Sequence, residues 1–337
     1  MILITGVAGF IGSNLAKYLI EQGEEVVGVD FLEEIGYNNN IKLDRLKELG
    51  IDTIKIGRAI TSKKYENFNF SYVEINDKKR LNEIFIEFHI KTVIHLAAIT
   101  GTKLSEIYPS KFININIQGF NTILELSKDY AVNKIMYASS SSIYGVTADR
   151  SKKLLKESDN TNLPMSMCAT TKKSNELIAH TYSHIHNIKT VGMRFFNVYG
   201  PWDKPCSSVY IFTKKIINNK PITIYNNGKT IRDFTYIDDV VKSIYLLMKD
   251  NSIGLYKIYN IGNSEPIKII DFIKEIEKNL NKESEKSFVG NNVTNIRYTG
   301  ADTTLLEEVI KFKPSISYKI GIKKFIDWYF KYNLKNL

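Results

Sequence analysis

Residues 2–12 read ILITGVAGFIG, an apolar run that ends in a turn whose three glycines fall three residues apart. Glycine lets a backbone turn tightly and approach a pyrophosphate closely. The next segment, Gly12–Gln22, carries apolar residues at helical spacing, and the first N–H groups and positive dipole end of such a helix favour phosphate. The stretch therefore predicts a strand, a phosphate-binding turn and a helix. The predicted phosphate-binding residues are Gly6, Gly9, Phe10, Ile11 and Gly12.

An acidic residue stands 18 residues after the last of these glycines, at the end of a second apolar strand, Glu25–Asp30. A carboxylate in that position accepts hydrogen bonds from a ribose diol and repels a 2′-phosphate. The turn and Asp30 together predict NAD rather than NADP as the cofactor.

Strand and helix signals alternate through the first half of the chain, which predicts an α/β fold with a Rossmann-type doubly wound parallel sheet. After residue 196 the pattern becomes patchier, and we expect a smaller C-terminal α/β domain there. The polar insertion 31–71 is predicted to be a surface loop rather than a mobile flap. The other predicted strands are Phe70–Ile75, Thr92–Leu96, Lys134–Ser139 and Thr190–Phe196, and the other predicted helices are Lys78–Phe88, Ser110–Tyr130 and Lys173–His186.

Composition excludes several classes of protein. The chain has 337 residues, of which 43% are hydrophobic and 24% charged, so disorder is not expected. Its net charge of +10 suits anionic ligands, but the sequence has no polybasic block that would favour nucleic acid. No apolar run is long enough to span a membrane. Cys168 and Cys206 fit a reducing cytoplasm, and Met1 opens directly into an apolar strand, so no signal peptide is expected. His180 and His184 lack the acidic pattern of a metal site, and no metal is predicted.

Five further motifs show a resemblance that runs from Ile2 to about Tyr329. The chain resembles the extended short-chain dehydrogenases/reductases that act on nucleotide sugars, in particular the UDP-glucuronate 4-epimerases and related UDP-hexose epimerases. The resemblance implies bound NAD, a nucleotide-diphosphate sugar substrate and a homodimer or higher homo-oligomer. The motifs are HLAA (95–98), NIQG (116–119), YASSSSIYG (137–145), RFFNVYGPW (194–202) and RDFTYIDDVV (232–241).

The resemblance implies a division into an NAD-binding domain at 1–190, with 232–262 packing back onto it, and a substrate-binding domain at 191–231 and 263–337. It also implies a set of cofactor contacts. Glu74 and Ile75 fall where the family recognises adenine, Ala97 and Ala98 where it lines the cofactor phosphates and ribose, and Asn116 where it holds the strand ends.

The family's chemistry is hydride transfer at a sugar carbon, usually C4. A Tyr takes the hydroxyl proton, a Lys four residues later lowers the pKa of that Tyr and holds the nicotinamide ribose, and a Ser or Thr bonds the same sugar oxygen. In this chain PMSMCATTK (164–172) puts Cys168 at the Tyr position and keeps the Lys as Lys172. Ser140 falls at the hydroxyl position, with Ser141 and Ser142 beside it.

The cysteine changes the expected mechanism. A thiol has an ordinary pKa of about 8.5 against about 10 for a phenol, so acidity is no obstacle, but the sulfur does not reach as far as the phenol oxygen. The site could oxidise C4 through a water or another base, bind substrate without turnover, or carry a Tyr that was replaced to trap a complex. The residues do not separate these three alternatives.

The substrate side also carries over by position. Asn197 and Arg232 match residues that hold the nucleotide diphosphate in the family. Tyr225 falls near the family's nucleobase pocket. Arg194 matches an Arg of the uronate epimerases, and the alternative for Arg194 is an ion pair at the end of its strand. The sequence departs from the uronate epimerase pattern at Thr102-Lys103 and at 294–297. The identities of the substrate's sugar and nucleobase therefore stay open. The expected substrate contacts are Lys103, Ser142, Arg194, Asn197, Tyr225, Arg232 and Arg297.

Because losing the Tyr hinders both proton transfers of an epimerase cycle, we expect a nucleotide-sugar 4-dehydrogenase that forms a 4-keto sugar for surface-polysaccharide synthesis. A capsular GDP-linked heptose is one candidate substrate. The alternatives are a UDP-glucuronate or UDP-hexose 4-epimerase with its Tyr changed to Cys, and a nucleotide-sugar-binding protein without catalysis.

Overall fold

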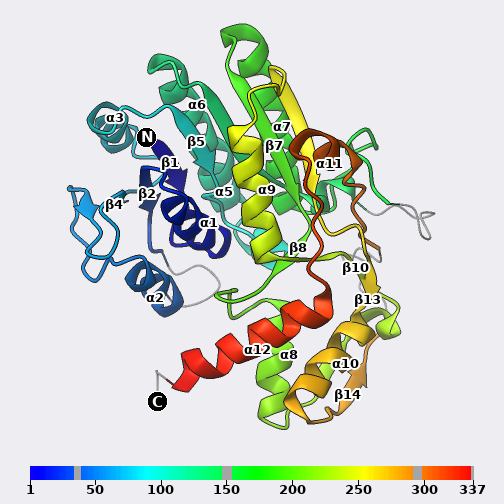
Figure 1. Ribbon diagram of the computed structural model, residues 1–337. Coiled ribbons are helices and arrows are strands. Elements are labelled where there is room, and N and C mark those ends of the chain that lie inside the picture. Colours follow the sequence, from blue (N-terminus) through cyan, green and yellow to red (C-terminus); the bar gives the residue numbers. More distant parts are fainter. Residues whose placement is uncertain (34–38, 146–153, 291–297, 335–337) are drawn as a thin grey trace.

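The computed structural model describes residues 1–33, 39–145, 154–290 and 298–334. At its centre is an eight-stranded sheet with the order β12-β7-β6-β5-β1-β2-β4-β3, in which β3 alone of these strands runs antiparallel to its neighbour (Figure 1). This confirms the predicted α/β fold with a mostly parallel sheet. The strands are β1 (Ile2–Thr5), β2 (Val26–Asp30), β3 (Ile60–Thr61), β4 (Phe68–Tyr72), β5 (Thr92–His95), β6 (Lys134–Ser140), β7 (Lys189–Phe195) and β12 (Tyr256–Ile261).

Helices cover both faces of this sheet, because successive strand residues point to opposite sides. In β1, Ile4 belongs to the core shared with α1 and α9, whereas Leu3 belongs to the core shared with α3 and α6. All four residues of β1 are buried, as expected for a central parallel strand. The helices of the sheet are α1 (Phe10–Glu21), α2 (Asn40–Glu48), α3 (Lys78–Glu87), α4 (Thr102–Ile107), α5 (Pro109–Phe112), α6 (Gly119–Asp129), α7 (Met167–His186), α9 (Ile237–Lys249) and α11 (Thr304–Ile310), with the short turns η1 (Ile113–Gln118) and η2 (Ser141–Tyr144).

A second group of elements packs beyond the carboxyl ends of the strands, at the bottom of Figure 1. It contains three two-stranded sheets, in which β10 pairs with β13, β11 with β8 and β14 with β9. Its α10 and α12 lie against each other across the buried Phe272 and Phe325. The elements are β8 (Asn197–Tyr199), α8 (Ser208–Ile217), β9 (Ile222–Ile224), η3 (Tyr225–Gly228), β10 (Ile231–Arg232), β11 (Phe234–Tyr236), β13 (Ile267–Lys268), α10 (Ile269–Leu280), β14 (Lys286–Phe288) and α12 (Tyr318–Leu334).

The strand order reverses at β1. From this strand the chain passes to β2 and β4 on one side, and later to β5, β6 and β7 on the other. In open α/β sheets, ligands bind outside the carboxyl ends of the strands at such a reversal, because the two adjoining loops diverge there. The sheet therefore places a site between the loops that follow Thr5 and His95.

The insertion 31–71 was expected to be a loop, and this expectation is wrong in part. The structure has a helix, α2, and the short strand β3 within it. Ile41 and Leu46 are buried, and Leu46 joins the main core. Lysines and acids separate these few apolar residues, so the segment looked uniformly polar in sequence.

Several predicted boundaries also shift. Helix α1 begins two residues before Gly12, and α7 begins at Met167 rather than at residue 173. Strand β4 ends at Tyr72, so Glu74 and Ile75 follow the strand rather than belong to it. The predicted helix 110–130 is interrupted by the π-helical turn η1, a feature that local sequence periodicity does not reveal and that is common at functional sites.

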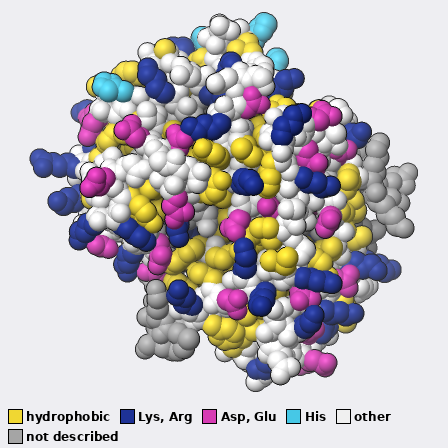
Figure 2. All heavy atoms as spheres, in the orientation of Figure 1, with side chains coloured by type: hydrophobic (Ala, Val, Ile, Leu, Met, Phe, Trp, Pro, Cys, Tyr) yellow, Lys and Arg dark blue, Asp and Glu magenta, His cyan; other side chains and the backbone are white. Residues whose placement is uncertain are grey.

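Lys and Arg side chains are spread over the molecular face in Figure 2, with Asp and Glu side chains between them. Within the described residues, no helix combines the length and the apolar character that crossing a bilayer requires. The same part of the chain contains no cluster of three or more His, Cys, Asp or Glu side chains suited to a metal ion.

Candidate active site

The glycine-rich turn joins β1 to α1 and is closed by its own backbone. The Gly9 N–H donates to the Gly6 carbonyl at 3.0 Å. Gly6 has a φ of +75°, and a Cβ at Gly12 would lie 2.1 Å from the Gly6 oxygen. Neither position accepts a side chain, so the predicted spacing of the glycines has a direct structural cause. Because Gly9 precedes the helix without a side chain, the first N–H groups of α1 stay free for an anion.

Asp30 ends β2 directly beside this turn. Its Oδ2 accepts the Ala8 N–H at 2.9 Å, and the residue is 9% exposed. Burial raises the pKa of the Asp30 carboxyl, an effect that the nearby Lys42 ammonium opposes. The carboxylate is thus fixed in place at the strand end, where the sequence predicts a contact with the ribose diol.

A cavity of about 640 Å³ opens between the loops after β1, β2, β4 and β5. This size lies in the usual range for a cofactor site. It brings the phosphate-binding turn, the ribose carboxylate and the predicted adenine contacts to one place, so the residues fit a dinucleotide. Its wall includes Gly6, Gly9, Asp30, Glu74, Ile75, Ala97, Ala98 and Lys103, together with Lys42, Thr100, Ile115, Lys204 and Cys206.

Asn116 lies in the π-helical turn η1 and is fully buried. Its amide accepts the Ile99 N–H at 2.8 Å and donates to the Ile99 carbonyl at 3.0 Å and to the Thr171 hydroxyl at 3.0 Å. The Asn175 amide in turn donates to the Asn116 carbonyl. Asn116 therefore joins the loop after β5 to α7, and it does so from behind the cavity wall rather than as part of it.

The predicted hydroxyl, thiol and ammonium groups lie on β6 and α7. Lys172 is 4% exposed and donates to the Ala138 carbonyl of β6 at 2.9 Å, next to the serine run. The Ser140 hydroxyl accepts the Ser142 N–H and the Ser142 hydroxyl, at 3.2 and 2.9 Å. Cys168 is one helical turn before Lys172 and is partly exposed, so both side chains project from one face of α7.

Burial sets the protonation of Lys172. Desolvation lowers its pKa to about 8, and the nearby Cys168 opposes this shift. Among the described residues, Lys172 has no ion pair with a carboxylate. Ser141 is buried, with 8% exposed, and faces the protein rather than solvent.

On the substrate side, Arg232 has a distinctive environment. Burial lowers the pKa of this guanidinium to about 10, and its Nη1 donates to the Ile231 carbonyl at 2.9 Å. The adjacent Asp233 carboxylate instead accepts the N–H groups of Asn263, Ser264 and Ala301, so it fixes the surrounding loops rather than neutralising Arg232. A partly buried cation that has no acidic partner among the described residues is suited to a diphosphate.

The other predicted substrate contacts lie apart from one another. Asn197 begins β8, exposed, and its amide oxygen accepts the Thr299 hydroxyl at 3.4 Å. Tyr225 is 40% exposed at the start of η3. Lys103 lines the dinucleotide cavity, and Arg297 lies outside the described residues.

Arg194, predicted as a substrate contact, lies in a buried ion pair instead. Its Nε and Nη2 donate to the two carboxylate oxygens of Glu176 at 2.8 and 3.0 Å, and Nη1 donates to the Tyr144 hydroxyl and the Glu157 carbonyl. Arg194 is 3% exposed and Glu176 1%. These partners occupy the guanidinium, which corrects the substrate assignment in favour of the strand-end ion pair.

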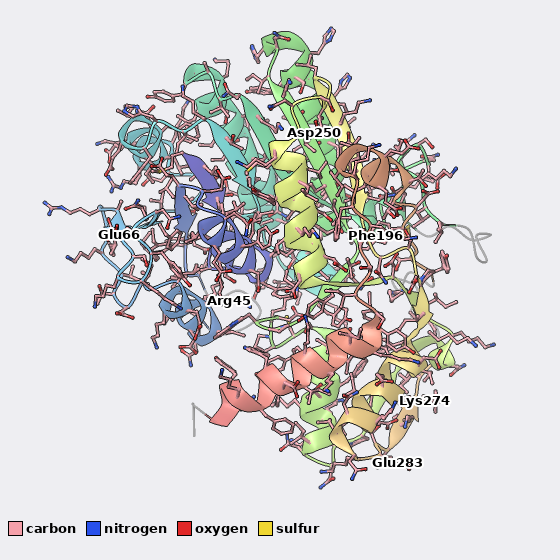
Figure 3. All side chains as sticks on the ribbon, in the orientation of Figure 1. Arg45, Glu66, Phe196, Asp250, Lys274 and Glu283 are labelled. Carbon is pink, nitrogen blue, oxygen red and sulfur yellow. The ribbon has the colours of Figure 1, made fainter. Side chains whose placement is uncertain are left out.

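Sequence analysis missed Arg45, which is 1% exposed on α2 and is labelled in Figure 3. Its Nη1 donates to the Ala8 carbonyl of the phosphate-binding turn at 2.9 Å, and its Nε and Nη2 donate to the Trp202 carbonyl at 3.1 and 2.6 Å. Two residues beyond Trp202, Lys204 reaches the Thr100 hydroxyl at 3.2 Å and lines the dinucleotide cavity. Arg45 thus links the turn to a loop from the substrate side. The sequence did carry one signal for this position: Arg45 lies at helical spacing between Ile41 and Leu49, which puts it on the same helix face as two apolar residues.

Replacing Arg45 by alanine is expected to weaken NAD binding by roughly tenfold and to lower the free energy of unfolding by about 1–3 kcal/mol, because two buried carbonyls lose their donor. Calorimetric titration with NAD and denaturant unfolding measure the two effects. Arg45→Lys should restore part of the affinity, and the exposed Arg58→Ala should change neither quantity. Unchanged NAD binding in a folded Arg45→Ala variant would contradict the linking role.

Comparison with known proteins gives the class. Residues 2–262 match the NAD dependent epimerase/dehydratase family. Protein CapI of Staphylococcus aureus is 41% identical, with 99% of each chain covered, and a UDP-glucuronate 4-epimerase of Thermodesulfobacterium geofontis is 36% identical, with 97% of this chain and 95% of the relative covered. The crystal structure of UDP-glucuronic acid 4-epimerase from Bacillus cereus, in complex with UDP-glucuronic acid and NAD, superposes with a TM-score of 0.86 at 29% identity and covers 98% of this chain and 99% of that one.

The chain therefore belongs to the NAD dependent epimerase/dehydratase family. The predicted resemblance to nucleotide-sugar epimerases and the predicted NAD cofactor are confirmed at this level. When bound, the nicotinamide supplies a hydride acceptor. The residues placed to hold the dinucleotide are the glycine-rich turn, Asp30 and the loops that line the cavity.

Proposed function

We propose that this protein is a nucleotide-sugar 4-dehydrogenase, which removes hydrogen from C4 of a nucleotide-diphosphate sugar and leaves a 4-keto sugar. The observation that carries the proposal is Cys168, one helical turn before Lys172, whose Nζ donates to the Ala138 carbonyl of β6. The cavity lined by the glycine-rich turn, Asp30 and the loops after β4 and β5 supports bound NAD as the electron acceptor. What the site lacks is the phenol that would move the proton in both directions.

An epimerase must take a proton from the C4 hydroxyl and later return one to the opposite face of the sugar. One properly placed acid–base group can do both, and such a group contributes about 10²–10⁴-fold to each transfer. Cys168 cannot reach as far as a tyrosine oxygen from the same position. Oxidation alone needs one proton transfer, so loss of the phenol impairs it less than it impairs the two transfers of an epimerase cycle. This difference supports the dehydrogenase.

The partly buried Arg232 supports a nucleotide diphosphate as the part of the substrate that the protein binds. Its guanidinium has no acidic partner among the described residues, and a diphosphate would supply the missing negative charge. Asn197, Tyr225 and Lys103 are the further proposed contacts. Since nucleotide-linked sugars are activated donors for glycan assembly, we place the reaction in surface-polysaccharide synthesis.

Incubation with a panel of UDP- and GDP-linked sugars tests this function. We expect reduced nicotinamide, seen by its near-ultraviolet absorbance, in a one-to-one ratio with a 4-keto sugar. Continued turnover should then need an added oxidant such as a 2-keto acid. Interconversion of two sugars without net reduction would identify an epimerase, and binding without a spectral change would identify a non-catalytic protein; either result overturns the proposal.

The variant Cys168→Tyr separates the dehydrogenase from an epimerase whose tyrosine has been lost. If the pocket is built around the cysteine, the variant should not gain epimerisation. A large gain with any sugar of the panel would show that the missing phenol was the one defect of an epimerase site.

A further inference from the structure

The site needs a proton acceptor, because oxidation at C4 releases the hydroxyl proton as well as a hydride. The described groups near the serine run limit the choice. Tyr144 is buried, its hydroxyl donates to Asn260, and burial raises its pKa to about 12. Burial lowers the pKa of His95 to about 3, and its Nδ1 is bonded to the Thr5 hydroxyl. Neither group is an effective base near neutral pH. The Glu176 carboxylate accepts the Ser139 hydroxyl, but it is buried in the ion pair with Arg194. Cys168 and Lys172 remain.

Lys172 differs from a lysine that serves only in a structural ion pair, because among the described residues no carboxylate pairs with its ammonium. Its Nζ donates to the Ala138 carbonyl at 2.9 Å, two residues before Ser140 in β6. The nearest acid along its own helix face is Glu176, one turn further on, and that carboxylate is occupied by Arg194. Lys172 is therefore a buried amine, held at the catalytic strand end without an acid to keep it charged.

We propose that the neutral amine of Lys172 is the proton acceptor for the C4 hydroxyl, acting across one water in the space that a tyrosine would fill. This inference rests on the proposed function. In the step, the O–H bond of the C4 hydroxyl breaks and its proton passes through the water to Nζ, which becomes an ammonium. The C4–H bond breaks at the same time, its electron pair goes to oxidised NAD, and the C4–O bond becomes a carbonyl.

The surroundings of Lys172 favour this role. The titratable groups that face it are Cys168 from α7 and His95 from β5. His95 is neutral, so it does not stabilise the Lys172 ammonium. Of the two groups, only Cys168 opposes the lowering of the Lys172 pKa by burial. A fraction of the amine is therefore neutral near physiological pH. A water can bridge groups that are too far apart for direct contact, at little cost in binding energy. In a site with the phenol, by contrast, the charged lysine would serve to stabilise a phenolate.

The sign of the pH dependence follows. Below about pH 8 the amine is protonated and cannot accept a proton, and above it the amine is free. The rate of C4 oxidation should rise through pH 8 and then level off. Lys172→Arg preserves a positive charge and a donor for Ala138, but arginine stays protonated. This variant should bind NAD within a few-fold of the parent protein and lose roughly 10²–10⁴ in the oxidation rate.

The test combines two measurements on the NAD-loaded protein. The titration of the Lys172 Nζ is followed by NMR with isotope-labelled lysine and assigned with Lys172→Arg. The pH dependence of single-turnover oxidation is followed with the best sugar of the panel. We expect both midpoints near pH 8. In Cys168→Ala we expect the rate to keep its pH dependence, with the midpoint moved to lower pH because the group that opposes the desolvation shift is gone.

Other outcomes overturn the inference. These are a Lys172 titration near its ordinary pKa of about 10.4, an undiminished rate in Lys172→Arg, or loss of the pH dependence in Cys168→Ala, which would identify the thiolate as the acceptor. If the parent protein oxidises a sugar but the rate does not follow Lys172, this inference alone fails. If no sugar is oxidised at any pH, the proposed function fails with it.

Discussion

Replacing Glu176 by glutamine is expected to lower the free energy of unfolding by about 3–5 kcal/mol, the range for removing one partner of a buried ion pair. Glu176 accepts from both Nε and Nη2 of Arg194, and also from the Ser139 hydroxyl at 2.7 Å. Both charged side chains are almost fully buried. The loss therefore leaves a guanidinium without counter-charge in a medium of low dielectric. Denaturant unfolding measures the change.

Two variants make this prediction specific. The exposed pair of Lys78 and Glu125 has a similar separation of 2.7 Å, but water screens it, so Glu125→Gln should leave the unfolding midpoint almost unchanged. Replacing both members of the buried pair, as in Glu176→Leu with Arg194→Met, should recover most of the lost stability because no unpaired charge remains. If Glu176→Gln unfolds like the parent protein, the pair does not have the buried geometry described here.

Asp30→Ala is expected to reduce NAD affinity by roughly 100-fold or more. In the predicted contact the carboxylate accepts two hydrogen bonds from the adenosine ribose, and bonds to a charged group contribute about 1.5–3 kcal/mol each. The variant also removes the acceptor of the Ala8 N–H in the phosphate-binding turn. Because the carboxylate repels a 2′-phosphate, the ratio of NADP to NAD affinity should rise at the same time. Calorimetric titration with both dinucleotides measures this.

Asp52→Ala serves as the matched control for Asp30. Asp52 is exposed and pairs with Lys63 on the surface, so its loss should leave both dinucleotide affinities unchanged. Circular dichroism establishes that Asp30→Ala is folded before binding is compared. A folded Asp30→Ala protein that binds NAD as tightly as the parent would remove the basis for assigning this carboxylate to the ribose.

The reach of sequence analysis can be judged from particular residues. The phosphate-binding turn and Asp30 were predictable because most of their requirements are local. Gly6 has a positive φ, Gly12 lies against the Gly6 carbonyl close to it in the chain, and Asp30 ends its own strand. The parallel sheet was predictable for the same reason, since burial on both faces produces short apolar runs separated by amphipathic helices. Cys168, at the position where the resemblance places a Tyr, was likewise visible without coordinates.

Other features depend on how distant segments pack. Arg194 could have been a substrate contact or an ion pair, and the choice depends on α7 bringing Glu176 against β7. Arg45 contacts Trp202, 157 residues away, and lies in a segment that looked like a loop. Lys204 and Cys206 reach the dinucleotide cavity because their loop crosses from the other half of the molecule.

The primary structure alone was thus enough for the fold class and the cofactor, because these are carried mainly by short-range backbone geometry and by apolar patterning. The partners of buried charges required the packed molecule. A guanidinium or an ammonium pairs with whichever group the folded chain brings within hydrogen-bonding distance, and local sequence patterns contain no record of that distance.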